Sequence, residues 1–377
     1  MTREANDAPG IMGVYGSKIS YYTGKFEAYL RYRGIPYESF PTVPHNQKLI
    51  DAVGIVQMPV VQLANGRWMT DTTPMIAWLE GQQADASIYP SDPVLNFIAL
   101  LIEDYADEWL WRSAMHYRWT YRISRQYAAE FLYNELIKGV PLIRGKFSLP
   151  RFAGINLLKR RQYFGFVRGD GVAAATRDHV DGTFLAALDR MQAILARRPF
   201  LLGDTPTIAD FGMMAPMFRH FSQDPTPAEI MRERAPKVYE WVARMWTIKP
   251  HESAANLITG VDQSLGAFLD EICETHLEQQ RQNADAYSRG DKRFGMTIQG
   301  TIYKSVPSSR YRVWCLEQLR AAWMQLEPED AARLKNVLSS KFAQIIWDET
   351  DFKPSGYDAQ DAAPFNRAIN VFEQGVP

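Results

Sequence analysis

The stretch MPVVQLANGRWMTDTTPMIAWLE, residues 58–80, decides the fold, because it holds two strands, their turn and a helix in one short run. Residues 58–63 are rich in β-forming side chains, and Asn65-Gly66 is a typical two-residue hairpin turn. Residues 67–70 predict the second strand of this hairpin, and residues 71–80 predict a helix. A hairpin followed directly by a helix indicates a small α/β unit.

The residues before this stretch predict the remainder of that unit. Residues 1–10 are polar and helix-breaking and have no periodicity, which predicts a disordered leader. The elements expected next are a strand at 11–15, a helix at 24–33, a strand at 37–41 and a short helix at 47–53. With the hairpin and its helix, the expected order is β-α-β-α-β-β-α.

The residues after this unit have a different pattern. From about residue 91 to about residue 246 the chain has long helical periods rich in Trp, Tyr, Leu and Arg. A third part follows Pro250. It contains a helix expected at 261–287, an alternating segment at 292–304, a helix at 312–326 and a tail with Pro, Asp and Gly.

Composition limits the classes of protein to which the chain can belong. Its 377 residues predict two or three domains, and the formal net charge of −1 gives no overall field to attract nucleic acid or an anionic membrane. No transmembrane segment or secretory signal is recognisable, so a cytoplasmic location is expected. Cys273 and Cys315 are too far apart for a zinc-binding pair, and we expect both to be small buried residues.

Hydroxyl side chains gather at the start of the helix expected at 24–33. Ser20 to Thr23 precede a helix face formed by Phe26, Tyr29 and Leu30. One interpretation is helix capping, in which a hydroxyl oxygen accepts a hydrogen bond from an unpaired backbone N–H. The other is that this helix N-terminus holds an anion, such as a thiolate. The residues alone leave both open.

A second distinctive segment, RRPFLLGDTPTIADFGMMAPMF, covers residues 197–218. Thr207 and Asp210 are three residues apart, the spacing of a capping box, so we expect them to be structural. This segment, with Met58-Pro59 and DTTPMIAWLE around the hairpin, resembles the glutathione S-transferase superfamily, in particular a bacterial-type member with a C-terminal extension. The first helix is also similar to that of the metaxin and failed-axon-connections branch.

The resemblance implies a fold and its boundaries. It implies a thioredoxin-like α/β domain that binds glutathione at residues 11–85, an all-α glutathione transferase C-terminal domain at 91–255, and an additional mainly helical extension at 256–377. No chemistry is attached to this extension.

The resemblance also implies the site. Ser20 takes the place of the residue that hydrogen-bonds the glutathione sulfur, with Tyr22 and Tyr15 as alternatives. Glutathione itself would be bound by Met58, Pro59, Asp71 and Thr72, and the Met58-Pro59 peptide would be cis. The family's helix opposite glutathione corresponds to residues 103–122, so Trp111, Arg112 and His116 are weak candidates for the substrate pocket.

The charged residues of the 103–122 segment have a simpler interpretation than a metal site, either a solvated helix face or ion pairs within the chain. No metal is expected, because the six histidines lack the spacing that would place two on one helix face.

The expected function follows from the resemblance. It is glutathione-dependent transfer or thiol chemistry on a small hydrophobic electrophile, with glutathione as co-substrate, in a homodimeric detoxification enzyme. The alternative is a non-catalytic adaptor or interaction protein with the same fold. The sequence does not identify the electrophile.

Overall fold

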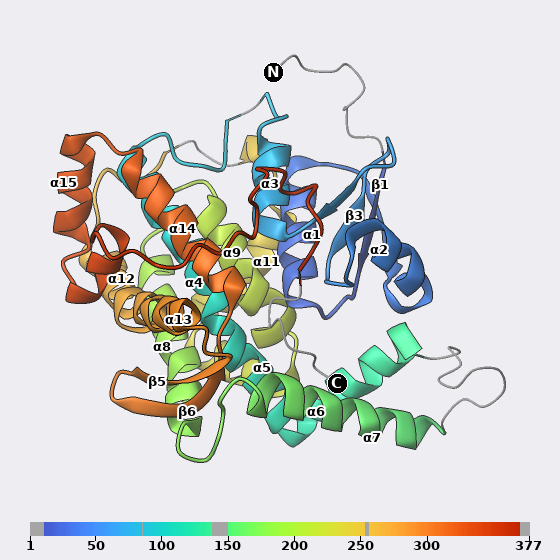
Figure 1. Ribbon diagram of the computed structural model, residues 1–377. Helices are drawn as coiled ribbons and strands as arrows, with labels where there is room; N and C mark the ends of the chain where they lie inside the picture. Colours follow the sequence, from blue (N-terminus) through green and yellow to red (C-terminus); the bar gives the residue numbers. More distant parts are fainter. Residues whose placement is uncertain (1–10, 85, 138–149, 253–255, 370–377) are drawn as a thin grey trace.

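The computed structural model describes residues 11–84, 86–137, 150–252 and 256–369 (Figure 1). A small mixed sheet with its helices lies at one side of the molecule, and helices form the remainder, including those of the C-terminal part. The fold class expected from the sequence is therefore confirmed. The leader expected at residues 1–10 lies outside the described residues.

The sheet has four strands in the order β2-β1-β3-β4. They are β1 (Met12–Gly16), β2 (Tyr37–Pro41), β3 (Val60–Gln62) and β4 (Trp68–Thr70). β1 and β2 are parallel, whereas β1/β3 and β3/β4 are antiparallel. Gly66 has a φ of 85° in the turn between β3 and β4, which confirms the hairpin predicted at Asn65-Gly66.

Three helices cover the two faces of this sheet. They are α1 (Tyr21–Arg33), α2 (Asn46–Val53) and α3 (Thr72–Glu80). Val14 and Val61 pack in the core cluster that includes α1 and α3, while Tyr15 and Val60 pack with α2. This alternation is expected because successive side chains of a strand point to opposite faces. α1 begins three residues earlier than predicted, since Ser20 caps it.

The helical part contains eight α-helices among the described residues. They are α4 (Pro93–Glu108), α5 (Leu110–Thr120), α6 (Arg122–Leu132), α7 (Arg151–Gln162), α8 (Arg177–Leu195), α9 (Ile208–Pro216), α10 (Pro225–Arg234) and α11 (Pro236–Thr247). α9 packs closely on α4, because a Cβ at Gly212 would lie 2.6 Å from the Glu103 Cα.

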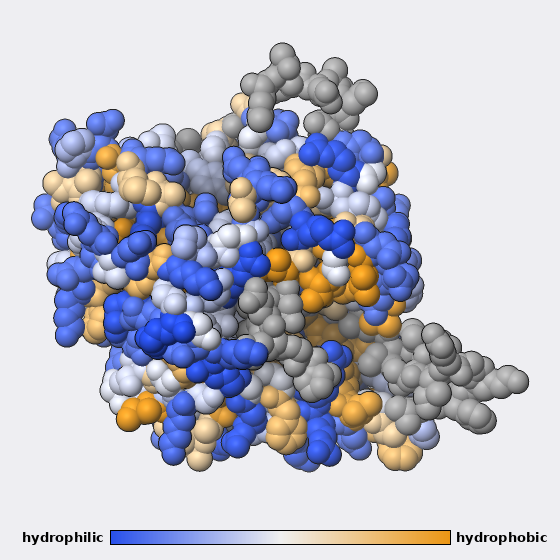
Figure 2. Space-filling view, in the orientation of Figure 1, coloured by the Kyte–Doolittle hydropathy of each residue, from blue (hydrophilic) through white to orange (hydrophobic). Residues whose placement is uncertain are grey.

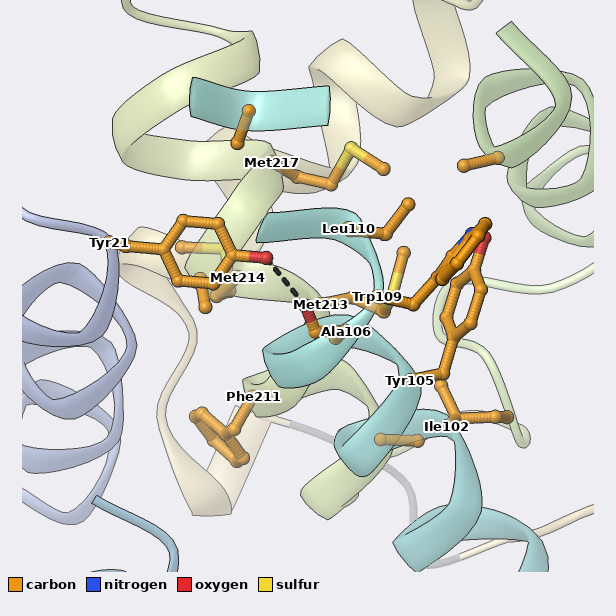
Figure 3. Close-up of a cluster of buried hydrophobic side chains, with 14 of the residues drawn as sticks. Tyr21, Ile102, Tyr105, Ala106, Trp109, Leu110, Phe211, Met213, Met214 and Met217 are labelled. Carbon is orange, nitrogen blue, oxygen red and sulfur yellow. Dashed lines mark hydrogen bonds between the residues drawn. The ribbon is translucent and has the colours of Figure 1, made fainter. Parts of the chain in front are cut away.

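The sheet unit and the helical part share one hydrophobic core. Figure 3 shows Tyr21 of α1 pointing at α4, where its hydroxyl donates a hydrogen bond of 2.5 Å to the Ala106 carbonyl. Met213 and Met214 of α9 lie beside this contact. α1 is therefore fixed against both α4 and α9, which holds its N-terminus in place.

Residues 103–122 do not form one continuous helix. α4 ends at Glu108 and α5 begins at Leu110, with Trp109 between them, and α5 ends at Thr120. Glu103, Asp104 and Asp107 are buried, so the interpretation as a solvated face is wrong, and the other interpretation, ion pairs within the chain, is confirmed. Partners from α1 and from the C-terminal part cover these carboxylates.

The C-terminal part packs onto the helical part. It contains α12 (Gln263–Ile272), α13 (Glu278–Arg289), β5 (Arg293–Ile298), β6 (Thr301–Pro307), α14 (Arg310–Met324) and α15 (Pro328–Val337). The alternating segment forms the antiparallel β5–β6 hairpin, and α14 lies along α4. Cys273 and Cys315 are buried and unbridged, as expected. None of the described helices is long and apolar enough to cross a lipid bilayer.

Candidate functional site

The sheet brings three separate segments together at one end of its strands β1, β3 and β4. Tyr15 of β1 is paired with Val60 of β3, and Val60 is paired with Thr70 of β4. The loop that leads to Ser20, the Met58-Pro59 peptide and the Asp71-Thr72 pair all adjoin these three paired residues. The Met58-Pro59 peptide is cis, which confirms the expectation.

Ser20 is the N-cap residue of α1. Its Oγ accepts a hydrogen bond from the Thr23 backbone N–H at 3.4 Å. Among the residues that the structure describes, no acceptor faces the hydroxyl hydrogen of Ser20. The interpretation of Ser20 as a helix cap is therefore confirmed. Its hydroxyl hydrogen can still be donated to an anion at the same helix N-terminus.

The two alternative hydroxyls are placed differently. Tyr22 donates to the Asp107 backbone carbonyl at 2.9 Å, so its hydroxyl hydrogen is already used. Tyr15 packs with α2 on the other face of the sheet, where its hydroxyl accepts from Lys48 at 2.9 Å. Ser20 is therefore the best placed of the three to contact a thiol.

Asp71 stands at the entry to α3 with a φ of 72°, in the left-handed region. Its two carboxylate oxygens accept hydrogen bonds of 3.0 Å each from the hydroxyls of Tyr311 and Tyr357. Burial raises the pKa of Asp71 to about 6, although both hydrogen bonds act in the opposite direction. Thr72 is buried in the first turn of α3.

The last described residues of the chain are hydrogen-bonded to β4, to the end of α2 and to the loop between α2 and β3. The Thr70 N–H donates to the Pro364 carbonyl at 3.0 Å, and the Ala368 N–H donates to the Val53 carbonyl at 2.8 Å. The Gln57 side chain donates to the Ile369 carbonyl at 2.6 Å. Figure 1 shows this dark red segment crossing to α3 and the blue sheet. We call residues 357–369 the closing segment.

A buried ion cluster lies between α1 and α4. The Lys25 ammonium contacts the carboxylates of Glu103 and Asp107, with a distance of 2.5 Å to Asp107, and Thr73 donates to Glu103. Burial alone would lower the pKa of Lys25. The two carboxylates raise this pKa by more than burial lowers it, so the net shift is upward. Burial raises the pKa of Asp107 well above its usual value. This cluster fixes α1 and α3 to α4.

α14 covers the site from the side of the helical part. The Arg312 guanidinium lies 3.1 Å from the Glu108 carboxylate. Burial raises the pKa of Glu108 to about 7 in spite of this ion pair. Arg312 and Tyr311 are adjacent on α14, so one turn of this helix contacts both α4 and Asp71.

The three candidate residues of the substrate pocket lie in different parts of the protein. Trp111 stacks on Tyr22 with ring centroids 5.7 Å apart, and therefore borders the α1 N-terminus. Arg112 is buried in an ion pair of 3.1 Å with Asp170. His116 is buried and lies 3.2 Å from Asp181. Arg112 also donates to Gln279 of α13. Arg112 and His116 thus serve internal contacts, and of the three residues only Trp111 borders the α1 N-terminus.

Sequence reasoning missed four residues that the structure places here, Lys25, Tyr311, Arg312 and Tyr357. The hydrogen-bond partners of Tyr311 and Tyr357 are 240 and 286 residues away along the chain, so no local pattern could reveal these contacts. Lys25 gave a weak signal, because it lies four residues from both Tyr21 and Tyr29 and so shares a helix face with two aromatic residues.

Two family models match the chain. Residues 14–87 match the model described as glutathione S-transferase, N-terminal domain, and residues 174–244 match glutathione S-transferase, C-terminal domain. No curated protein matches.

Solved structures give remote similarities. A glutathione S-transferase from Pseudomonas fluorescens is 19% identical, with 62% of this chain and 94% of that chain covered and a TM-score of 0.37. The beta-etherase LigF from Sphingobium sp. strain SYK-6 is 17% identical, with 63% and 95% covered and a TM-score of 0.43. A Methylobacterium radiotolerans transferase in complex with glutathione sulfonate is 18% identical, with 67% and 99% covered and a TM-score of 0.35. These similarities are too remote to indicate an activity. The two domain matches lie in the expected order along the chain, so residues 14–87 and 174–244 are similar to the N- and C-terminal domains of glutathione S-transferases.

Proposed function

We propose that the protein carries out glutathione-dependent transfer or thiol chemistry on a small hydrophobic electrophile. The observation that supports this most is the sheet register, in which Tyr15, Val60 and Thr70 are paired side by side. Through this register Ser20, Met58-Pro59 and Asp71-Thr72 meet at one edge, and these are the positions that the family resemblance gives to glutathione.

Each group has a chemical role in this proposal. The Ser20 hydroxyl and the N-terminus of α1 lower the pKa of the glutathione thiol, because both favour the thiolate, which is the nucleophile. The backbone of Met58 binds the cysteinyl part. The N-terminus of α3 with Thr72 binds the γ-glutamyl carboxylate, and Asp71 balances its ammonium group.

The C-terminal contacts add a condition to the proposal. Both carboxylate oxygens of Asp71 already accept hydrogen bonds, one from Tyr311 and one from Tyr357. The Pro364 carbonyl accepts a hydrogen bond from the Thr70 N–H. An ammonium group that binds Asp71 competes with these donors. Glutathione binding is therefore coupled to release of the closing segment.

The same contacts favour a second candidate function, a non-catalytic interaction protein in which the closing segment fills the site permanently. Homodimer formation, a cytoplasmic location and a role in detoxification are part of the first proposal only.

Titration calorimetry with glutathione separates the two functions. We expect saturable binding to the full chain, weakened by Thr72→Ala because Thr72 lies at the α3 N-terminus. Thr247→Ala is the matched control, since Thr247 bonds only to carbonyls of its own helix. If neither the wild type nor Tyr357→Phe, which removes one contact of the closing segment with Asp71, gave heat above that of dilution, the interaction protein would remain as the function.

A further inference from the structure

α7 and the π-helix that follows it, Tyr163–Arg168, expose hydrophobic side chains. One side of this segment, residues 151–168, packs inward through Ile155, Leu158 and Val167. The other side exposes Phe152 to 71%, Leu157 to 55% and Phe164 to 56%. We call Phe152, Leu157 and Phe164, with the basic residues around them, the α7 surface.

This exposure is concentrated. Nine large hydrophobic residues are strongly exposed in the described part of the chain. Four of these lie on α6, on α7 and on the π-helix after α7, namely Ile123, Phe152, Leu157 and Phe164. Scattered exposed hydrophobic residues are normal, but a group on one element marks an interaction site.

All charged side chains of the same segment are positive. Residues 150–169 contain Arg151, Lys159, Arg160, Arg161 and Arg168 and no Asp or Glu, although the whole chain has a net charge of −1. Within the described ranges no carboxylate pairs with Arg160, Arg161 or Arg168. Arg160 instead lies over the ring of Phe164 at 5.8 Å. These arginines are thus available to an anionic partner.

Hydrophobic and basic groups alternate along this surface. Figure 1 places α7 at the lower edge of the molecule, where Figure 2 shows hydrophobic and hydrophilic residues side by side. A partner that fits both must be anionic at its surface and apolar just below it. A lipid bilayer with anionic headgroups has this order, since basic residues bind the headgroups while Phe and Leu enter the region beneath them.

Other anionic partners fit less well. A nucleic acid offers phosphates and base faces, but Leu157 has no ring on which a base could stack. An acidic protein surface would neutralise the arginines, but would leave three apolar side chains against charged groups.

We propose that the α7 surface docks the protein on anionic lipid membranes. The segment lies on the membrane surface and does not span it. This inference does not depend on glutathione chemistry, because the α7 surface shares no residue with the site described above.

Sedimentation with lipid vesicles tests the proposal on the full chain. We expect the protein to bind vesicles of phosphatidylcholine mixed with phosphatidylglycerol but not vesicles of phosphatidylcholine alone, and salt to weaken the binding. Leu157→Ser with Phe164→Ser removes the apolar part, and Arg160→Glu with Arg161→Glu reverses the charge. Each pair should weaken binding by more than about ten-fold.

The β5–β6 hairpin supplies a matched control. Ile302 is 62% exposed and Lys304 is also exposed, so Ile302→Ser with Lys304→Glu makes the same kinds of change elsewhere. Thermal melts confirm that each variant is folded. Equal loss of binding in the control and α7 variants would overturn the proposal. It would also be overturned if single-stranded RNA bound through these arginines while vesicles did not, or if the α7 variants only changed self-association.

Discussion

At the scale of single residues, the site depends on how two polar side chains are shared between folding and binding. The Ser20 oxygen accepts from the Thr23 N–H and so stabilises α1, and the same hydroxyl is the proposed donor to the glutathione sulfur. The Asp71 oxygens accept from two tyrosines and are also the proposed partner of an ammonium group. Each residue therefore predicts an effect on stability and an effect on the ligand.

Ser20→Ala should raise the pKa of the thiol of bound glutathione, because a hydrogen bond to the thiolate is lost. Affinity for S-methylglutathione should stay nearly unchanged, and the unfolding free energy should fall by about 0.5–2 kcal/mol with the lost cap. Ultraviolet absorbance of the thiolate measures the first effect. Tyr22→Phe is the control. If Tyr22→Phe raised the thiol pKa and Ser20→Ala did not, the tyrosine would be the donor.

Asp71 predicts a dependence of stability on pH. Its pKa is raised by burial to about 6 in the folded protein, so the folded chain holds a proton that the unfolded chain has lost. This contribution is fully present below the unfolded pKa and disappears as pH rises through about 6. Between about pH 5 and pH 7 the unfolding free energy should therefore fall relative to Asp71→Asn, by about 1 kcal/mol at most. Urea unfolding at several pH values measures this difference, and parallel curves for the two proteins would refute it.

At the scale of elements, the short-range features could be predicted from sequence and the long-range contacts could not. The β3–β4 hairpin follows from Asn65-Gly66, and the start of α9 follows from Thr207 and Asp210, because each signal lies within a few residues. The capping box of α9 is present. By contrast, the sequence could not decide between a solvated face and ion pairs within the chain for the α4 carboxylates, because their partners come from other parts of the chain.

The capping box predicts a graded loss of stability. Asp210 accepts from the Thr207 N–H, the Leu201 N–H and the Trp241 indole, at 3.0, 3.0 and 3.1 Å. Thr207→Ala should lower the unfolding free energy by about 0.5–2 kcal/mol. Asp210→Ala should cost more, because it leaves several buried donors without an acceptor. Chemical denaturation measures both, and equal losses would mean that Asp210 acts only as part of the cap.

The Lys25 cluster predicts a loss that a second change can reverse. Lys25→Met leaves the carboxylates of Glu103 and Asp107 buried without their cation, which should cost about 3–5 kcal/mol of unfolding free energy. Adding Glu103→Gln and Asp107→Asn to Lys25→Met should restore most of this loss, because the uncompensated charge is gone. Denaturation of the single and triple variants tests this. A triple variant less stable than Lys25→Met would show that packing, not charge, causes the loss.

At the scale of the whole molecule, the C-terminal part connects the helical part with the proposed glutathione site. α14 packs on α4 and brings Tyr311 to Asp71, while the closing segment is hydrogen-bonded to Thr70 of β4 and to Val53 at the end of α2. In the proposed function, the chain therefore competes with glutathione for this site. The family resemblance predicted the site but attached no chemistry to the extension, so this competition was not predictable from sequence.

The most direct test is the dissociation constant of glutathione for the wild type and for Tyr311→Phe with Tyr357→Phe, measured by calorimetry. Loss of two hydrogen bonds to Asp71 should favour the released state by about 1–3 kcal/mol, and so tighten glutathione binding by about five- to 150-fold. Tyr239→Phe, on α11, is the matched control and should leave affinity unchanged. Tighter binding in the double variant alone is the predicted result. Equal affinity in all three proteins, or no glutathione binding by any of them, would contradict the account.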